Sequence, residues 1–374
     1  MKKADGTEKR IVMCVWGLTG SGKSTHGMYI FDKRNARIYM EKFGIAPTEY
    51  VSDQVVRNDD IVAIFEDRVE GSEKGSWTKT EGVDETQGAI WDAGMSPRAL
   101  HENTEFGPDG NPSFKGELFQ FYGAPNRNAR TVFYLADTGY FDGNVVSSGP
   151  LNMAILISPG YFTDYAWLKI EDPALAAKVL ADGRTIGHPA QAKAVIGRVR
   201  YVTRYCLPFT MGTSNTAHVI RFHEFLKKRK ESGNPIEAYK FNTTGRIVAK
   251  YEWVKQKLGD KTVELPNTKL VEVDDIPRAM GGTRTTIEET ELFILQAARG
   301  TVKYEPHPIW GEKALVPVKV EGIPKERLRE LYSTSHLPMD EIKRLLKAQI
   351  LASKYYLGQQ CSGLPDHIRN AMDF

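Results

Sequence analysis

The sequence predicts a mixed α/β fold in which helices pack around a central sheet. A short apolar run at 11–16, bounded by glycine, is typical of a buried strand, and the glycine-rich segment after it leads into a helix. Further strand-like and helical runs follow along the whole chain. Strands are expected at 131–135, 153–157, 247–254 and 269–273, and helices at 173–182, 191–204, 215–230, 287–298 and 339–357.

The composition is that of an ordinary globular protein. The chain has 374 residues, of which 41% are hydrophobic and 26% are charged. This length allows one large domain or two. Because no repeat, low-complexity linker or firm boundary interrupts the chain, we expect a single domain over 1–374, with 335–374 as a C-terminal helical extension of it.

Charge and cysteine content narrow the class of protein. The net charge of +3 is close to balanced, so no nucleic-acid partner is predicted. No stretch reaches transmembrane length, and the first apolar run is too short for a signal-peptide core. The three cysteines lack metal-ligand spacing and fit a reducing compartment. We therefore expect a cytoplasmic protein without a membrane partner.

Gly17 to Ser24 spell G-x-x-x-x-G-K-S, the phosphate-binding P-loop. Its glycines allow positive φ and bring backbone N–H groups close to an anion. Lys23 supplies positive charge to the β- and γ-phosphates, and the Ser24 hydroxyl is a hard oxygen ligand for Mg²⁺. The helix expected to begin near Thr25 points its positive end at the same phosphates. The segment therefore predicts binding of a nucleoside triphosphate with Mg²⁺.

The residues expected to contact the nucleotide are those of the loop and the start of its helix: Gly17, Leu18, Thr19, Gly20, Ser21, Gly22, Lys23, Ser24 and Thr25. His26 follows them, and we expect it on the helix surface, although a contact with the nucleotide is an alternative.

A carboxylate is expected to join Ser24 at the metal. Residues 49–56 read as a short apolar strand that carries Asp53, and an aspartate on a strand downstream of a P-loop commonly holds Mg²⁺. Asp53 is therefore the candidate. Asp59 and Asp60 are rivals, because they precede the apolar run at 61–65. Each of the three is otherwise an ordinary residue of a solvated turn.

Several later motifs narrow the family. In order they are Phe65-Glu66, Trp77-Thr78-Lys79-Thr80, Ile90-Trp91-Asp92-Ala93, Leu100-His101-Glu102-Asn103, Asn128-Ala129-Arg130, and Gly281-Gly282-Thr283-Arg284 with Thr290. Together with GLTGSGKST and VSDQ, they resemble the nucleotide-binding, C-terminal half of ATP-dependent phosphoenolpyruvate carboxykinase. The resemblance runs in order from about residue 10 to about residue 350.

The resemblance implies a P-loop-containing carboxykinase-type domain and its reaction. In that reaction oxaloacetate, a small dicarboxylic acid, loses CO₂ to give pyruvate enolate, which takes the γ-phosphoryl group of ATP. The implied roles are contact with the transferred phosphoryl group for Lys23, Lys79 and Arg130, metal binding for Ser24 and Asp53, and contact with the adenosine for Arg284 and Thr290. Cations at the moving phosphate suit this chemistry, although Lys79 and Arg130 are otherwise ordinary surface cations.

Two departures from the family pattern leave alternatives open. Gln54 follows Asp53 where the family has an acidic pair. The family's substrate lobe, which precedes the P-loop and holds oxaloacetate and a second, transition metal such as Mn²⁺, has no counterpart in this sequence. The lobe is then a separate partner chain, the sequence is a fragment, or the protein is a stand-alone kinase built like HPr kinase. A regulatory module that binds ATP without turnover is a further alternative.

Overall fold

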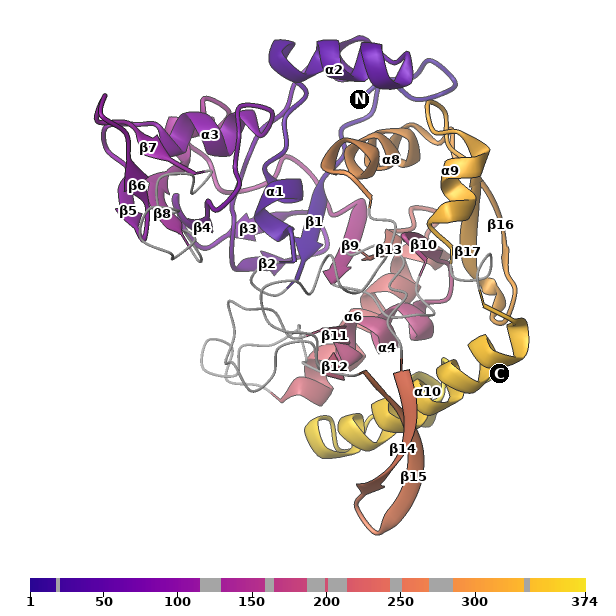
Figure 1. Ribbon diagram of the computed structural model, residues 1–374. Helices are drawn as coiled ribbons and strands as arrows, with labels where there is room; N and C mark the ends of the chain where they lie inside the picture. The colour runs from indigo at the N-terminus through magenta and orange to yellow at the C-terminus, as the bar shows by residue number, and fades with distance from the viewer. Residues whose placement is uncertain are drawn as a thin grey trace. The chain divides into compact units, whose positions relative to one another are not determined.

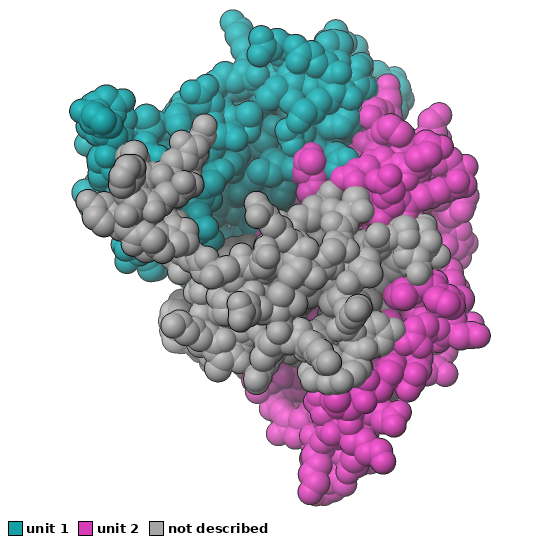
Figure 2. All heavy atoms as spheres, in the orientation of Figure 1, with its two compact units in different colours: residues 1–14, 22–152, 287–301 teal, residues 15–21, 153–286, 302–374 magenta. Residues whose placement is uncertain are grey.

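The computed structural model describes residues 1–17, 21–114, 129–158, 165–186, 199–200, 214–242, 251–268, 285–332 and 337–374. The chain divides into two compact units, coloured teal and magenta in Figure 2. Unit 1 comprises residues 1–14, 22–152 and 287–301, and unit 2 comprises residues 15–21, 153–286 and 302–374. The sequence, which predicts a single domain, shows no boundary because each unit is assembled from three separate segments.

Unit 1 is built from short helices and small antiparallel sheets (Figure 1). Its elements are α1 (Lys23–Gly27), α2 (Lys33–Phe43), η1 (Pro47–Glu49), β2 (Val62–Ile64), β3 (Val69–Gly71), β4 (Gly75–Lys79), α3 (Gly88–Gly94), β5 (Leu100–Glu102), β6 (Glu105–Phe106), β7 (Pro112–Ser113), β8 (Arg130–Tyr134), η3 (Leu135–Thr138) and α8 (Ile287–Arg299). The sheet β4-β8-β5 is antiparallel throughout. A buried cluster that includes Met28, Ile90, Phe114 and Phe133 forms the core of the unit.

Unit 2 contains most of the largest sheet in the described part of the chain (Figure 1). Its elements are β9 (Met153–Ser158), β10 (Trp167–Ile170), α4 (Pro173–Asp182), β11 (Thr185–Ile186), β12 (Val199–Arg200), α6 (Asn215–Glu231), β13 (Glu237–Asn242), β14 (Tyr251–Leu258), β15 (Lys261–Thr268), β16 (Lys303–His307), β17 (Gly311–Lys319), α9 (Lys325–Glu330), α10 (Met339–Gln360) and α11 (Asp366–Arg369). The expected C-terminal extension, α10 and α11, belongs to this unit.

The six strands of the largest sheet lie in the order β1-β9-β13-β10-β17-β16, where β1 is Met13–Trp16. β9 runs parallel to β13, whereas β10 runs antiparallel to β13 and to β17, so the sheet is mixed. Every residue of β9 is buried, as expected for a strand covered on both faces. Helices α4, α6, α10 and α11 share one apolar cluster. The predicted class, mixed α/β with a central sheet and surrounding helices, is confirmed.

Elements with strong local signals form where they are expected. The strands at 131–135 and 153–157 correspond to β8 and β9, and the helices at 173–182, 215–230, 287–298 and 339–357 to α4, α6, α8 and α10. At α4 the side chain of Asp172 accepts a hydrogen bond from the Leu175 N–H, and Gly183 adopts φ 47° after the last turn. Both ends of this helix therefore have the predicted caps.

Other expectations are wrong or lie outside the described residues. Residues 50–56 form no strand, since only η1 (Pro47–Glu49) is regular there. The helix 191–204 is contradicted at 199–200, which form β12, and its remaining residues lie outside the described ranges. The strand expected at 269–273 also lies outside the described ranges. Of the strand expected at 247–254, the described residues 251–254 belong to β14. Within the described ranges, no helix is both long and apolar enough to cross a membrane.

Candidate functional site

The predicted phosphate-binding segment follows β1 and leads into α1. β1 ends at Trp16, and α1 begins at Lys23, two residues earlier than expected. Leu18, Thr19 and Gly20 lie outside the described residues. Gly22 precedes α1 with φ 93°, a left-handed conformation that disfavours any residue with a Cβ. A strand and a helix therefore flank the segment as predicted, with a glycine at position 22 where the backbone requires one.

Gly17 and Ser21 belong to unit 2, whereas Gly22 to Asn152 belong to unit 1. A Cβ on Gly17 would lie 2.2 Å from the Ser21 hydroxyl oxygen and 2.8 Å from the Ile157 carbonyl oxygen. Ser21 is 2% exposed, and its hydroxyl makes no hydrogen bond to any described residue. Gly17 is thus required by a close approach of the backbone to its neighbours.

Lys23 is held by the two aspartates that were rivals of Asp53. Its ammonium group donates to the Asp59 carbonyl oxygen and lies 3.8 Å from the Asp59 carboxylate and 3.6 Å from the Asp60 carboxylate. The Lys23 side chain is 21% exposed, Asp59 6% and Asp60 66%. Asp59 is therefore the buried partner of the loop lysine, and Asp60 is a solvated one.

Asp59 also connects Lys23 to strand β4. Its second carboxylate oxygen accepts hydrogen bonds from the Ser76 hydroxyl at 2.5 Å and the Thr78 hydroxyl at 2.8 Å. Ser76 and Thr78 are 5% and 2% exposed and contact each other through their hydroxyl groups. A buried carboxylate is stabilised when donors satisfy its oxygens, so these two hydroxyls fix the position of Asp59.

Glu73 adds a third carboxylate near Lys23. Partial burial and the negative charges of Asp60 and Asp59 raise the pKa of this exposed glutamate, while Lys23 opposes the shift. Ser24, half-buried, lies next to Lys23 in the first turn of α1. In the described part of the chain, no three His, Cys, Asp or Glu side chains are close enough together to form a metal site. The Ser24 hydroxyl and the carboxylates near Lys23 offer hard oxygen ligands. Such ligands suit a Mg²⁺ ion that takes its remaining ligands from phosphates and water.

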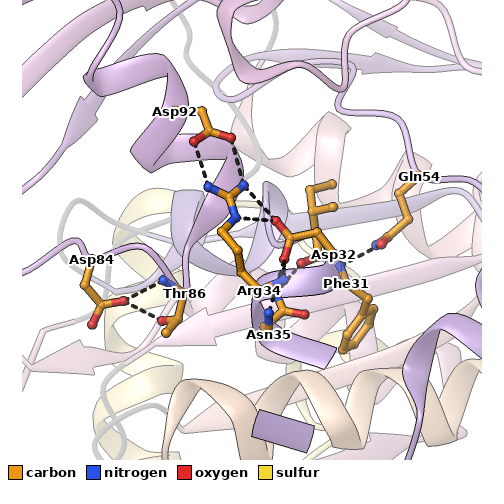
Figure 3. Close-up of polar contacts among 9 residues, drawn as sticks. Phe31, Asp32, Arg34, Asn35, Gln54, Asp84, Thr86 and Asp92 are labelled. Carbon is orange, nitrogen blue, oxygen red and sulfur yellow. Dashed lines mark hydrogen bonds and ion pairs between the residues drawn. The ribbon is translucent and has the colours of Figure 1, made fainter. Parts of the chain in front are cut away.

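Asp53 and Gln54 have different surroundings from those expected. Asp53 is exposed on an irregular segment and makes no ion pair or hydrogen bond with any described residue. The Gln54 side-chain oxygen accepts a hydrogen bond from the Phe31 N–H at 2.7 Å (Figure 3). Gln54 therefore fixes the chain that leaves α1. The strand expected at 49–56 is absent, and with it the support for Asp53 as the metal ligand.

Arg34 anchors the start of α2 in the same region (Figure 3). Its guanidinium group forms two hydrogen bonds with the Asp92 carboxylate, at 2.7 and 2.8 Å, and another with Asp32 at 2.7 Å. Asp32 also caps α2 by accepting from the Arg34 N–H. These carboxylates raise the pKa of Arg34. The arginine is thus engaged within the fold, where it fixes the start of α2 in unit 1.

Lys79 and Arg130 are direct neighbours across the β4–β8 pair. The Lys79 ammonium lies 2.8 Å from the Glu81 carboxylate, and the Arg130 guanidinium lies 4.5 Å from the centre of the Trp77 ring. The two positive charges predicted at the phosphoryl group are therefore adjacent, and an ion pair and a cation–π contact hold them.

Strand alternation separates this pair of cations from Lys23. Ser76 and Thr78 face the buried side of β4, where Asp59 and Lys23 lie, whereas Trp77 is 60% exposed on the other side. Successive side chains of a strand point to opposite faces, so Lys79 shares the face of Trp77. No described contact joins Lys23 to Lys79 or Arg130. Of the three predicted cations, the structure places Lys79 beside Arg130 and Lys23 apart from both.

His26, expected on the helix surface, is buried. It is 5% exposed, and its Nδ1 lies 2.6 Å from the carboxylate of Glu291 in α8. Burial raises the pKa of the Glu291 carboxyl, and His26 opposes that shift. Helix α1 ends at Gly27, and Met28 after it has φ −115°, outside the helical range. Met28, Tyr29 and Ile30 are all buried.

The residues expected at the adenosine are only partly described. Arg284 lies outside the described residues. Thr290 is 2% exposed within α8, so a contact with a nucleotide needs its neighbours to move. Its predicted role stays a prediction.

Comparison with known proteins adds no assignment, since no protein-family model and no curated protein matches the chain.

Proposed function

We propose that this protein binds a Mg²⁺-complexed nucleoside triphosphate through the Gly17–Ser24 segment and transfers its γ-phosphoryl group in a carboxykinase-type reaction. The observation that carries the proposal is the engagement of Lys23 by Asp59, the carboxylate tied to β4. A loop lysine and a buried carboxylate beside the loop are the two charges that a P-loop site places around the β- and γ-phosphates and their metal.

Asp59 replaces Asp53 as the proposed carboxylate of the metal site. Together with the Ser24 hydroxyl it offers hard oxygen donors, and Mg²⁺ commonly uses one or two protein oxygens plus phosphate oxygens and water. Bound Mg²⁺ would neutralise charge on the transferred group. The chain's own contribution is positional, because Ser76 and Thr78 hold Asp59 in place through hydroxyl hydrogen bonds.

Lys79 and Arg130 are proposed to contact the phosphoryl group during its transfer. An adjacent lysine and arginine offer several N–H donors to one anion, and fixed cations supply most of the catalysis in phosphoryl transfer. For these cations to meet a phosphate held by Lys23, the end of β4 has to bring Lys79 round to the other face of the strand. We propose that this movement accompanies nucleotide binding, as closing segments do in other kinases.

The acceptor under this proposal is the enolate of pyruvate, formed from oxaloacetate by loss of CO₂. Groups outside residues 1–374, on a separate chain or on another part of the same protein, would hold the dicarboxylate and a second metal such as Mn²⁺. Without them, water has access to the γ-phosphate, since a closed site is what protects such reactions from hydrolysis. We therefore expect at most slow ATP hydrolysis from the chain by itself.

A stand-alone kinase is the second candidate. One observation favours it. Lys79 of β4 and Arg130 of β8 lie on the face of this strand pair opposite to Lys23, where they could hold an acceptor rather than the phosphate of the nucleotide. Such an acceptor would be a hydroxyl group on a protein or a small molecule.

A coupled assay distinguishes the two candidates. The chain is incubated with ATP, oxaloacetate, Mg²⁺ and Mn²⁺, with and without partner chains from the same source, and phosphoenolpyruvate is measured. Product that forms only with a partner, and disappears in Lys23→Ala, supports the carboxykinase reaction. Rapid phosphorylation of a hydroxyl acceptor without phosphoenolpyruvate supports the kinase. ATP binding without any turnover would refute both and leave a regulatory module.

A further inference from the structure

Helix α1, which carries Lys23 and Ser24 in its first turn, lacks the usual means of holding itself in place. It spans five residues, and no side chain caps its N-terminus. The His26 N–H donates to the Gly22 carbonyl oxygen at 3.0 Å, and the Met28 N–H donates to the Ser24 carbonyl oxygen at 3.0 Å. A helix of this length is unstable in isolation, so contacts with the rest of unit 1 must fix its position.

His26 is the one residue of α1 that is buried. Its partner, Glu291, lies in α8, a helix in which every residue from Glu289 to Arg299 is buried. The two side chains are 5% and 4% exposed and approach to 2.6 Å. A short hydrogen bond between two side chains withdrawn from water has a well-defined geometry, and α8 provides the rigid support for it.

We propose that Glu291 is a positioning residue that, through His26, sets the place of Lys23 and Ser24 for the bound nucleotide. His26 lies one turn after Lys23 on α1, so a movement of the His26 ring also moves Lys23 and Ser24. The proposed roles of Lys23 and Ser24 belong to the proposed function, whereas the anchoring of α1 by Glu291 does not depend on it.

Hydrogen–deuterium exchange of the peptide covering residues 22–31 tests the anchoring without any nucleotide. Glu291→Leu should speed exchange of its helical amides by about 100-fold, because removing one member of a buried pair leaves the other unsatisfied. Glu291→Gln keeps the volume and an acceptor oxygen for His26, so it should speed exchange by about 10-fold or less.

Lys42→Gln is the matched control. It breaks the 2.7 Å ion pair between α2 and Glu288, one turn before Glu291 on the same helix, and leaves α1 untouched. Exchange in the 22–31 peptide should stay at the wild-type rate. Unchanged exchange in Glu291→Gln together with unchanged exchange in Glu291→Leu would overturn the anchoring. If Glu291→Leu does not fold, His26→Asn takes its place: the shorter side chain loses the contact with Glu291 and should speed exchange by more than about 10-fold. Wild-type exchange in His26→Asn then overturns the anchoring.

Calorimetric titration with Mg·ATP then separates positioning from general stability. Glu291→Gln should weaken binding by up to about 3-fold and Glu291→Leu by at least about 10-fold. A second control, Ile90→Val in the core of unit 1, lowers stability while leaving α1 in place and should bind like wild type. Affinity lost equally in Ile90→Val overturns the positioning role. If wild type itself does not bind Mg·ATP while exchange responds as predicted, the proposed function fails and the anchoring of α1 stands.

Discussion

Asp59 is the residue at which stability and the proposed chemistry can be measured with the same variants. Alanine at this position removes the acceptor of two hydroxyl donors, Ser76 and Thr78, both almost fully buried. Each hydrogen bond to a charged acceptor contributes about 1.5–3 kcal/mol, but the two hydroxyls contact each other and can pair once Asp59 is gone. Lys23 is partly exposed and keeps the Asp59 carbonyl oxygen, so its ion pair adds only about 0–1 kcal/mol.

Asp59→Ala should therefore lower the free energy of unfolding by about 3 kcal/mol, and Asp59→Asn, which keeps one acceptor oxygen, by about 1–2 kcal/mol. Urea denaturation followed by tryptophan fluorescence measures both. Asp60→Asn and Asp53→Asn are the matched controls, because both carboxylates are exposed, and each should change the value by no more than about 0.5 kcal/mol. Equal effects of the three Asn variants would refute the assignment of Asp59 as the buried partner.

The same variants test the metal assignment. Asp59→Asn should reduce phosphoryl-transfer turnover more than Mg·ATP affinity, because Mg²⁺ acts on charge that develops during transfer. If Asp53→Asn reduces turnover more than affinity and Asp59→Asn does not, Asp53 is the metal ligand, as the sequence predicts, and the proposed role of Asp59 fails.

Three further predictions concern Gly17, with Gly27 of α1 as its control, and the buried Lys178 of unit 2. Gly17→Ala should lower the free energy of unfolding by about 1–3 kcal/mol through overpacking, whereas Gly27→Ala, whose Cβ meets nothing within 4 Å, should leave it unchanged or raise it slightly in thermal denaturation. Lys178→Met should cost about 3 kcal/mol, because buried Asp182 loses its 2.8 Å charged partner and keeps the Ser353 hydroxyl, which donates to it at 2.6 Å. Lys178→Met/Asp182→Leu should recover part of that loss in melting temperature, since the Ser353 hydroxyl then lacks both partners. Burial lowers the pKa of Lys178 from 10.5, so the unfolded chain binds this proton more tightly than the folded chain does. The free energy of unfolding of wild type, relative to that of Lys178→Met, should therefore rise as the pH increases toward 10.5. Urea denaturation at a series of pH values measures this difference.

Local signals predicted much of the fold. Helix α4 has an aspartate cap, a proline in its first turn and a glycine stop, so its bounds follow from three short-range rules. β9 is an uninterrupted apolar run, and such runs indicate a strand buried on both faces. Residues 49–56 carry a weaker signal, because Ser52, Asp53 and Gln54 interrupt the apolar residues. Gln54 holds Phe31, and the segment stays irregular. Short apolar runs are therefore the weakest of these signals.

The candidate site was less predictable because its contacts are distant in sequence. Asp59 is fixed by hydroxyls 17 and 19 residues further along the chain, and neither Ser76 nor Thr78 has a local pattern that indicates a carboxylate partner. His26 reads as a surface residue, since its partner Glu291 lies 265 residues away. The adjacency of Lys79 and Arg130 depends on the register of β4 with β8, which the sequence alone does not specify.

Calorimetric titration of the full chain with Mg·ATP tests nucleotide binding, on which the proposed function depends. Wild type should bind, and Lys23→Ala should bind at least about 10-fold more weakly, because it removes a positive charge from the phosphates. Lys9→Ala, which removes an exposed lysine near the N-terminus in unit 1, should bind like wild type. Equal affinities of wild type and Lys23→Ala would contradict the proposal that the Gly17–Ser24 segment holds the triphosphate.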